Sequence, residues 1–120
     1  MTTPTGHTRA ICAGRVIGTA VQDAEGSKIG TVKEVVLDKL SSNIMFAAVS
    51  FGGFLGIGEK YHAVPWSELD YDEHSGAYVV RFTKEQLQSA PSDSMDALTR
   101  DDGVAYRNKS YDYYRTKPYW

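Results

Sequence analysis

Alternating hydrophobic and polar positions dominate the first two thirds of the chain and predict β-strands. From residue 15 onward the period is two, so that Ile17, Thr19 and Val21 share one face of an expected strand. The next segment, 23–26, has the sequence Asp-Ala-Glu-Gly, with Asp at the first and Gly at the last position of a type I turn. Residues 28–38 follow as the returning strand, and the sequence therefore predicts a β-hairpin.

The returning strand contains a break in its alternation. Ile29 is in phase with Val35, whereas Val32 falls on the opposite face. Either both faces of the strand are partly covered, or a β-bulge near Lys33-Glu34 resets the register. We favour the bulge, because strands of small barrels bend in this way when the barrel closes.

Residues 44–51 are apolar on both faces and too few to span a membrane, so they predict a central strand. One face of this strand can line a barrel. The other face needs a cover, which the later chain or a second subunit must supply. A glycine-rich segment follows, in which Phe54, Leu55 and Ile57 are unusually apolar for a loop.

Short strands are predicted at 61–64 and 77–82, with turns at 65–69 and 72–76. The clearest helix covers 84–89: Thr83 and Gln86 form a capping box before it, and Pro91 stops it. The predicted core consists of Ile17, Val21, Ile29, Val35, Phe46, Val64, Leu69, Val80 and Leu87.

The two ends of the chain differ in composition from this central part. Residues 1–12 show no periodicity and predict a flexible N-terminal arm, and 13–91 form the expected barrel domain. The tail, 92–120, is rich in aromatic residues, with Tyr106, Tyr111, Tyr113, Tyr114, Tyr119 and Trp120. Because disordered tails are poor in aromatics, we expect this one to dock on a barrel, either its own or that of a twofold-related subunit.

Composition and charge exclude several classes of protein. The chain has 120 residues, of which 42% are hydrophobic and 23% charged, which indicates one folded domain. The net charge of −2 argues against nucleic acid or an anionic membrane as the main partner. Cys12 is the only cysteine, so no internal disulfide can form. No export signal or long apolar run is present, and we expect a cytoplasmic protein without membrane insertion.

The sequence shows no convincing chemical motif. Gly53 and Gly58 stand at P-loop spacing, but Glu59 occupies the position of the required lysine. The three histidines share no metal-ligand spacing, and neither Cys12 nor Ser67 has an evident general base. We therefore expect no catalytic residue, no cofactor and no metal.

Several short motifs together carry a family resemblance. They are Val16-Ile17-Gly18, Asp23-x-x-Gly26, Ile29-Gly30-Thr31-Val32 with Val35-Val36-Leu37-Asp38, the segment 51–58, Val64-Pro65-Trp66-Ser67-x-Leu69 and Thr83-Lys84-Glu85-x-Leu87. In this order and spacing they resemble the PRC-barrel family, whose small β-barrel occurs in the photosynthetic reaction centre H subunit and in a ribosome maturation factor. Residues 113–120 look like the ending of stand-alone bacterial members.

The resemblance implies a mainly β fold: a small antiparallel β-barrel of about six strands, one short helix and the aromatic C-terminal tail. It also implies an adaptor surface without catalytic residues. The chain lacks a membrane anchor and a preceding second barrel, so neither a light-harvesting nor a direct ribosomal role carries over.

We therefore expect a non-enzymatic protein–protein interaction module, homodimeric and with a further unidentified protein partner. The candidate interface residues are Phe54, Leu55, Ile57, Trp66, Tyr113, Tyr114, Tyr119 and Trp120. An RNA-processing or ribosome-associated binding role is the alternative, and it predicts a contiguous basic face. A small-ligand or enzymatic role predicts a deep pocket around His62 and Glu59.

Overall fold

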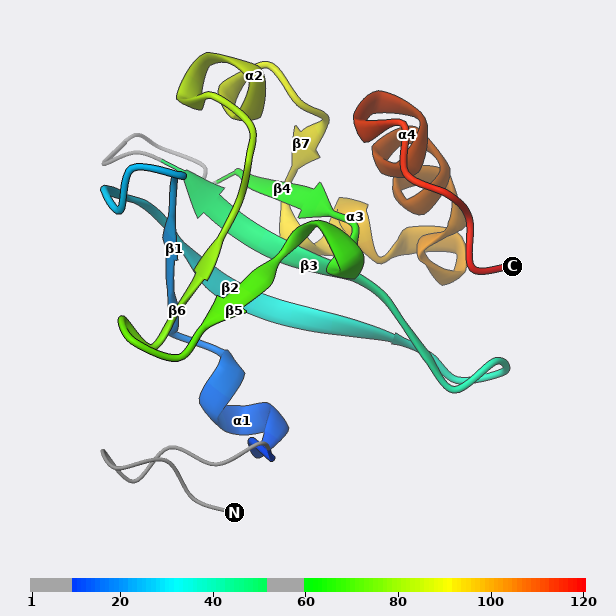
Figure 1. Ribbon diagram of the computed structural model, residues 1–120. Helices are drawn as coiled ribbons and strands as arrows, with labels where there is room; N and C mark the ends of the chain where they lie inside the picture. Colours follow the sequence, from blue (N-terminus) through cyan, green and yellow to red (C-terminus); the bar gives the residue numbers. More distant parts are fainter. Residues whose placement is uncertain (1–9, 52–59) are drawn as a thin grey trace.

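Seven strands form one sheet in the computed structural model, which describes residues 10–51 and 60–120 (Figure 1). The strands are β1 (Ala20–Gln22), β2 (Lys28–Asp38), β3 (Asn43–Phe51), β4 (Tyr61–Val64), β5 (Asp70–Asp72), β6 (Ala77–Val79) and β7 (Ser92–Asp93). Their order across the sheet is β5-β6-β1-β2-β3-β4-β7.

The predicted barrel is not confirmed in the described residues, where the strand count is seven rather than about six. The sheet has seven strands and stays open, with β5 and β7 at its two edges. β6 runs parallel to β1, because the β5–β6 hairpin brings the chain back beside the first strand in the same direction. The remaining strand pairs are antiparallel, and the mainly β class is confirmed.

The first hairpin, β1–β2, forms around Asp23 as its sequence predicts. The Asp23 carboxylate accepts hydrogen bonds from the backbone amides of Glu25 and Ser27, each 2.9 Å long. Gly26 closes the turn with a backbone φ of +89°, a conformation that glycine adopts without a steric penalty.

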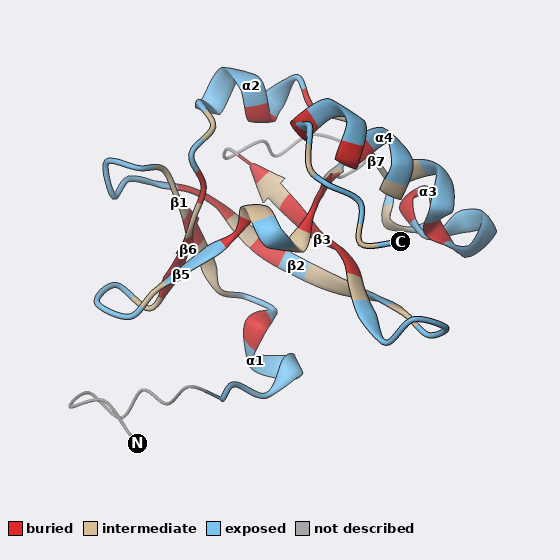
Figure 2. Ribbon diagram, turned by 45° about the vertical axis from the view of Figure 1, so that its right-hand side comes forward, coloured by how far each residue is buried: buried red, intermediate tan, exposed pale blue. Residues whose placement is uncertain are grey.

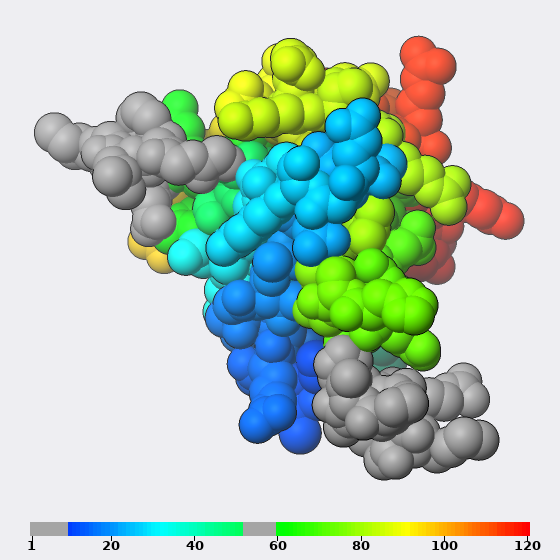
Figure 3. Space-filling model, turned by 60° about the vertical axis from the view of Figure 1, so that its left-hand side comes forward, coloured from blue at the N-terminus to red at the C-terminus, as the bar shows by residue number. Residues whose placement is uncertain are grey.

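The predicted start of the first strand is wrong. Residues before β1 form a short helix, α1 (Ala13–Val16), and Gly18 with φ +94° then redirects the chain into the strand. Val16, at the end of α1, is buried in the core beside the β-sheet, whereas the predicted core residue Ile17 is exposed. Figure 3 shows α1 in blue, next to the segment that forms β5 and β6 in green.

Two β-bulges bend the long β2–β3 hairpin. Lys33 has no partner between the pairs Val32↔Val49 and Glu34↔Ala48, which confirms the predicted bulge. A second bulge lies at Met45, where β3 has one residue more than β2. Beyond it, the tip of the hairpin projects from the body of the molecule (Figures 1 and 2).

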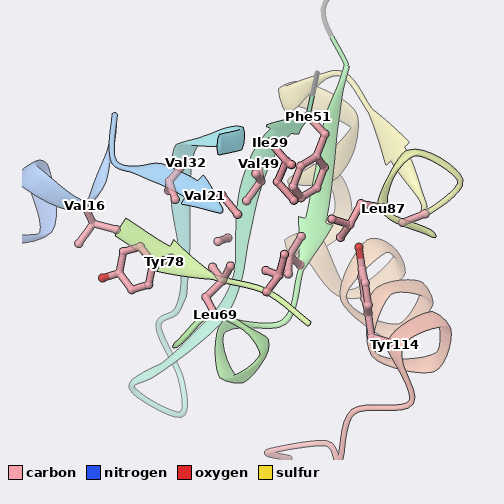
Figure 4. Close-up of a cluster of buried hydrophobic side chains, with 14 residues drawn as sticks. Val16, Val21, Ile29, Val32, Val49, Phe51, Leu69, Tyr78, Leu87 and Tyr114 are labelled. Atoms are coloured by element: carbon pink, nitrogen blue, oxygen red, sulfur yellow. The ribbon is translucent and has the colours of Figure 1, made fainter. Parts of the chain in front are cut away.

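The main core lies on the face of the sheet toward which β1, β3, β4 and β6 turn their apolar side chains (Figure 4). It contains Val16, Val21, Ile29, Val32, Ala47, Val49, Phe51, Val64, Leu69, Tyr78, Val80, Leu87, Ala90 and Tyr114. Six predicted core residues are confirmed here, namely Val21, Ile29, Val64, Leu69, Val80 and Leu87. Val35 is only half-buried against this cluster.

A second apolar cluster covers the opposite face of β3 and β4. It consists of Met45, Phe46, Ala48, Ala63 and Leu98, so the predicted core residue Phe46 is buried on this side. Leu98 comes from α3 (Met95–Leu98), which is followed by η2 (Arg100–Gly103) and α4 (Val104–Tyr114). The later chain therefore supplies the cover that the two-sided strand requires, and residues 92–120 pack on the sheet of their own chain.

Local hydrogen bonds define the remaining helical segments. In α2 (Lys84–Gln88) both halves of the predicted capping box are present: the Gln86 amide donates to Thr83 Oγ1, and the Thr83 amide donates to Gln86 Oε1. The turn after β4 contains a short 3-10 helix, η1 (Trp66–Glu68). Within the described residues, no helix is both long and apolar enough to cross a membrane.

Candidate interaction surface

Helix α4 is attached to the sheet by two hydroxyl groups. Ser110 Oγ donates a 2.7 Å hydrogen bond to the carbonyl of Ala63, just beyond the last pair that β4 forms with β7. The Tyr111 hydroxyl donates a 3.1 Å bond to the carbonyl of Met45 at the second bulge. Both carbonyls lie where a strand ladder is interrupted, so α4 satisfies backbone groups that the sheet leaves without partners.

The residues after α4 run back toward the β2–β3 hairpin. The Tyr119 hydroxyl donates a 2.7 Å hydrogen bond to Asp38 near the hairpin tip, and this bond lowers the pKa of the Asp38 carboxyl. The Arg107 guanidinium lies 3.7 Å from the ring centre of Trp120, whose edge also contacts Tyr111. A cation over an aromatic face is attractive, so the chain end has a defined position on the surface.

A groove of about 600 Å³ opens between the β2–β3 hairpin and the start of α4. Three of its lining residues are large, apolar and exposed: Leu40 at 100%, Leu37 at 62% and Val104 at 38% of the full residue surface. The complete lining is Val36, Leu37, Asp38, Lys39, Leu40, Met45, Thr99, Asp102, Gly103, Val104 and Arg107. Figure 2 shows the hairpin tip as an exposed projection beside this region.

The four charged residues of the groove fall into two groups. Asp38 is engaged by Tyr119, and Arg107 is engaged by Trp120 and by the side chain of Asn108. Lys39, on the hairpin, and Asp102, on η2, are exposed and form no ion pair with any described residue. The groove thus presents one available cation and one available anion on its two walls.

A second, more open groove of about 500 Å³ lies on the other side of the chain end. It is lined by Asn108, Tyr111, Asp112, Arg115, Thr116, Pro118 and Trp120. Trp120, which lines this second groove, is 52% exposed. Neither groove is lined by His62, around which the small-ligand alternative predicts a deep pocket.

The predicted interface residues occupy different environments. Phe54, Leu55 and Ile57 lie outside the described residues. Trp66 is half-buried with its ring centre 5.4 Å from that of Tyr78, and Tyr114 is buried in the main core. The structure therefore uses these two residues for internal packing.

The three remaining predicted residues lie in the C-terminal segment. Tyr113 is exposed and its hydroxyl donates to the carbonyl of Gln86, 2.7 Å away. Tyr119 and Trp120 come together, with ring centres 5.0 Å apart. Of the five candidates within the described residues, Tyr119 bonds to the hairpin through Asp38, and Trp120 packs beside Tyr119.

Sequence reasoning missed the apolar residues that surround the groove, which are Leu37, Leu40 and Val104. Leu40 had a recognisable signal, since it is the one apolar residue in the otherwise polar turn 39–43. An isolated leucine at the tip of a hairpin cannot reach the core of its own domain. Its exposure was therefore predictable, whereas its position opposite Val104 depends on how α4 packs.

The described residues offer little to a metal or a reaction. No group of three or more His, Cys, Asp or Glu side chains among them converges on a possible metal position. His62 is buried, its ring contacts Phe51, and its Nδ1 has no hydrogen-bond partner. Burial lowers the pKa of this histidine, against the opposing effect of a hydrogen bond with the Ala90 backbone. Glu59, which the small-ligand alternative placed beside His62, lies outside the described residues.

Comparison with known proteins identifies the family. The chain is 28% identical over 112 residues to an uncharacterised protein of Deinococcus radiodurans, an alignment that covers 86% of this chain and 39% of the relative. The chain thus spans well under half the length of that relative. The family model of the PRC-barrel domain matches residues 11–87, which is more than half of the chain and includes α1 and all strands up to β6. The protein therefore belongs to the PRC-barrel family.

Proposed function

We propose that the protein is a non-enzymatic protein-interaction module, an adaptor whose first partner is a second copy of itself. The observation that carries this proposal is the groove beside the β2–β3 hairpin, with Leu40, Leu37 and Val104 exposed around it. Scattered surface leucines are common, but apolar side chains gathered around one concavity are typical of an interaction site.

The use of the polar side chains supports the same proposal. Several hydroxyl and carboxyl groups of the C-terminal segment and the sheet bond to one another or to the backbone. Tyr106 donates to Asp93 at 2.6 Å, and Thr116 donates to Glu68 at 2.8 Å. Such pairs hold on the sheet the C-terminal segment, whose helix α4 forms one wall of the groove. The exposed apolar side chains of the groove match the apolar centre of a protein interface.

Sedimentation equilibrium of the purified chain tests this function. We expect a reversible monomer–dimer equilibrium with substantial dimer at tens of micromolar, since apolar burial drives association. A chain that stays monomeric at that concentration contradicts the self-association on which the adaptor function rests.

A further inference from the structure

We propose that the groove is a twofold self-docking site, in which the hairpin tip of each copy enters the groove of the other. The site is bounded by β2 and β3 on one side and by η2 and α4 on the other. This inference rests on the proposed self-association and specifies the surface and the contacts that produce it.

The first argument is shape. A twofold contact uses the same patch on both copies, so that patch must contain both a projection and a matching depression. The hairpin tip projects from the body (Figure 2). Leu40, in this tip, is fully exposed. The groove of about 600 Å³ lies directly beside it and has room for several side chains of an inserted turn. One patch of this chain therefore holds both shapes.

The second argument is the apolar content of the two walls. Leu37 and Leu40 come from the hairpin, and Val104 comes from the first residue of α4. In a reciprocal contact, Leu40 of each copy is covered by Val104 and Leu37 of the other. The contact would remove from water the three apolar side chains of the groove that its own chain leaves exposed.

The third argument is charge. Lys39 lies on the hairpin and Asp102 on the facing wall, and neither has an ion-pair partner among the described residues. The other two charged groups, Asp38 and Arg107, are already engaged within the chain. Reciprocal docking places Lys39 of each copy against Asp102 of the other, so two identical ion pairs form. A patch with one free cation and one free anion is complementary to itself.

A charge-exchange experiment tests this arrangement by sedimentation equilibrium of the full chain. In K39D both free charges of the groove are negative, and in D102K both are positive, so each variant alone repels itself. We expect each to raise the dimer dissociation constant by about tenfold or more. An equimolar mixture of the two variants restores both ion pairs, and we expect it to form a heterodimer close to the wild-type affinity.

A cysteine experiment locates the contact directly. Cys12 is exposed and is first replaced by serine. A Leu40→Cys chain mixed with a Val104→Cys chain is expected to give a disulfide-linked heterodimer under mild oxidation. Tyr71 is also exposed, at 42%, but lies on β5 at the far edge of the sheet, so Tyr71→Cys mixed with Val104→Cys serves as the control and should not cross-link.

The outcomes separate this inference from the proposed function. If the wild-type chain is monomeric, the self-association and the docking site both fail. If it is dimeric but K39D and D102K dimerise normally, and residues 40 and 104 do not cross-link, the dimer uses another surface and only the docking site is overturned. If K39D and D102K each dimerise weakly and their equimolar mixture does not recover the wild-type affinity, the reciprocal pairing of Lys39 with Asp102 is also overturned. Twofold pairing of these two residues requires that recovery.

Discussion

Gly30, in the middle of β2, illustrates how closely the two long strands approach each other. A Cβ atom added at this residue would collide with the carbonyl oxygen of Ser50 and would lie 2.7 Å from the Phe51 ring. Gly30 pairs with Phe51 in the ladder, so neither contact can relax without moving β3. The residue is glycine because its partner strand occupies the space of a side chain.

We expect Gly30→Ala to lower the free energy of unfolding by roughly 1–3 kcal/mol, the usual cost of overpacking. Gly14→Ala is the matched control: Gly14 lies in α1 and an added Cβ there meets nothing within 4 Å. That change should be neutral or slightly stabilising, since alanine favours a helix by about 1 kcal/mol over glycine. Urea denaturation of both variants measures the difference, and equal stabilities would contradict the close approach.

Two tyrosines of α4 make opposite use of their hydroxyl groups. The Tyr114 hydroxyl is buried without a hydrogen-bond partner, and burial strongly raises its pKa. The Tyr111 hydroxyl is also buried but donates to the Met45 carbonyl. In Figure 4 the Tyr114 side chain extends from α4 toward Leu87 and its apolar surroundings. The same residue type thus stabilises the fold through a hydrogen bond at one position and through its ring at the other.

We expect Tyr114→Phe to leave stability unchanged or raise it by about 1 kcal/mol, because the variant removes a buried group that lacks a partner. Tyr111→Phe, the matched comparison, leaves the Met45 carbonyl unpaired and should cost about 1–3 kcal/mol. The stabilities of the two variants, measured by thermal unfolding under the same condition, test this difference. A larger loss for Tyr114→Phe than for Tyr111→Phe would refute this assignment of roles.

At the scale of elements, β3 determines how the molecule is layered. Its sequence is apolar on both faces, and both faces are buried, one in the main core and the other under α3 and α4. This much follows from the sequence, because an isolated strand with two apolar faces needs two covers. The nature of the second cover does not follow from it.

Helix α4 was not predictable from periodicity. Its buried residues are Ser110, Tyr111 and Tyr114, and two of these three attach through hydroxyl groups bonded to the sheet. A helix that packs with so few purely apolar side chains has no clear hydrophobic stripe. By contrast, the turn at Asp23 and the capping box at Thr83 were predicted correctly, since their hydrogen bonds join residues within a few positions of each other.

Deletion of residues 104–120 tests α4 as a cover. Removal of Tyr106 uncovers part of the cluster around Phe46, and removal of Tyr114 takes a ring out of the main core. At about 25 cal/mol per Å², exposing the equivalent of two tyrosine side chains forfeits several kcal/mol. We expect a clearly lower Tm and increased binding of a hydrophobic dye, and an unchanged melting curve would contradict the docking of this segment on the sheet.

At the scale of the whole molecule, the sequence predicted the family and the mainly β class but not the open, seven-stranded sheet. Strand pairing between distant segments depends on packing that no local pattern contains. The parallel pair β1–β6 is an example, since Val21 and Tyr78 meet only after the β5–β6 hairpin has folded back. The sequence pointed to Tyr119 and Trp120 as candidate interface residues but not to Leu37 and Val104, because these two become neighbours only through the packing of α4.

One buried histidine contributes to the pH dependence of the stability of the fold. Burial lowers the pKa of His62 below its ordinary value of 6.5, so the folded chain disfavours the protonated imidazole. As the pH falls below 6.5, the unfolded chain takes up this proton more readily than the folded chain does, and stability is lost. The carboxyls of Asp38, Asp72 and Asp93 act at lower pH, because hydrogen bonds hold the pKa of each below 3.8.

We therefore expect the Tm to fall between about pH 7 and about pH 5, a window in which these carboxyls stay ionised. His62→Gln keeps a hydrogen-bonding side chain but cannot titrate, so it should flatten the Tm profile across this window. His74→Gln is the matched control, because His74 is exposed in the turn before β6, and it should keep the wild-type slope. If His62→Gln retains the full pH dependence, the loss of stability comes from another group and the role of His62 is refuted.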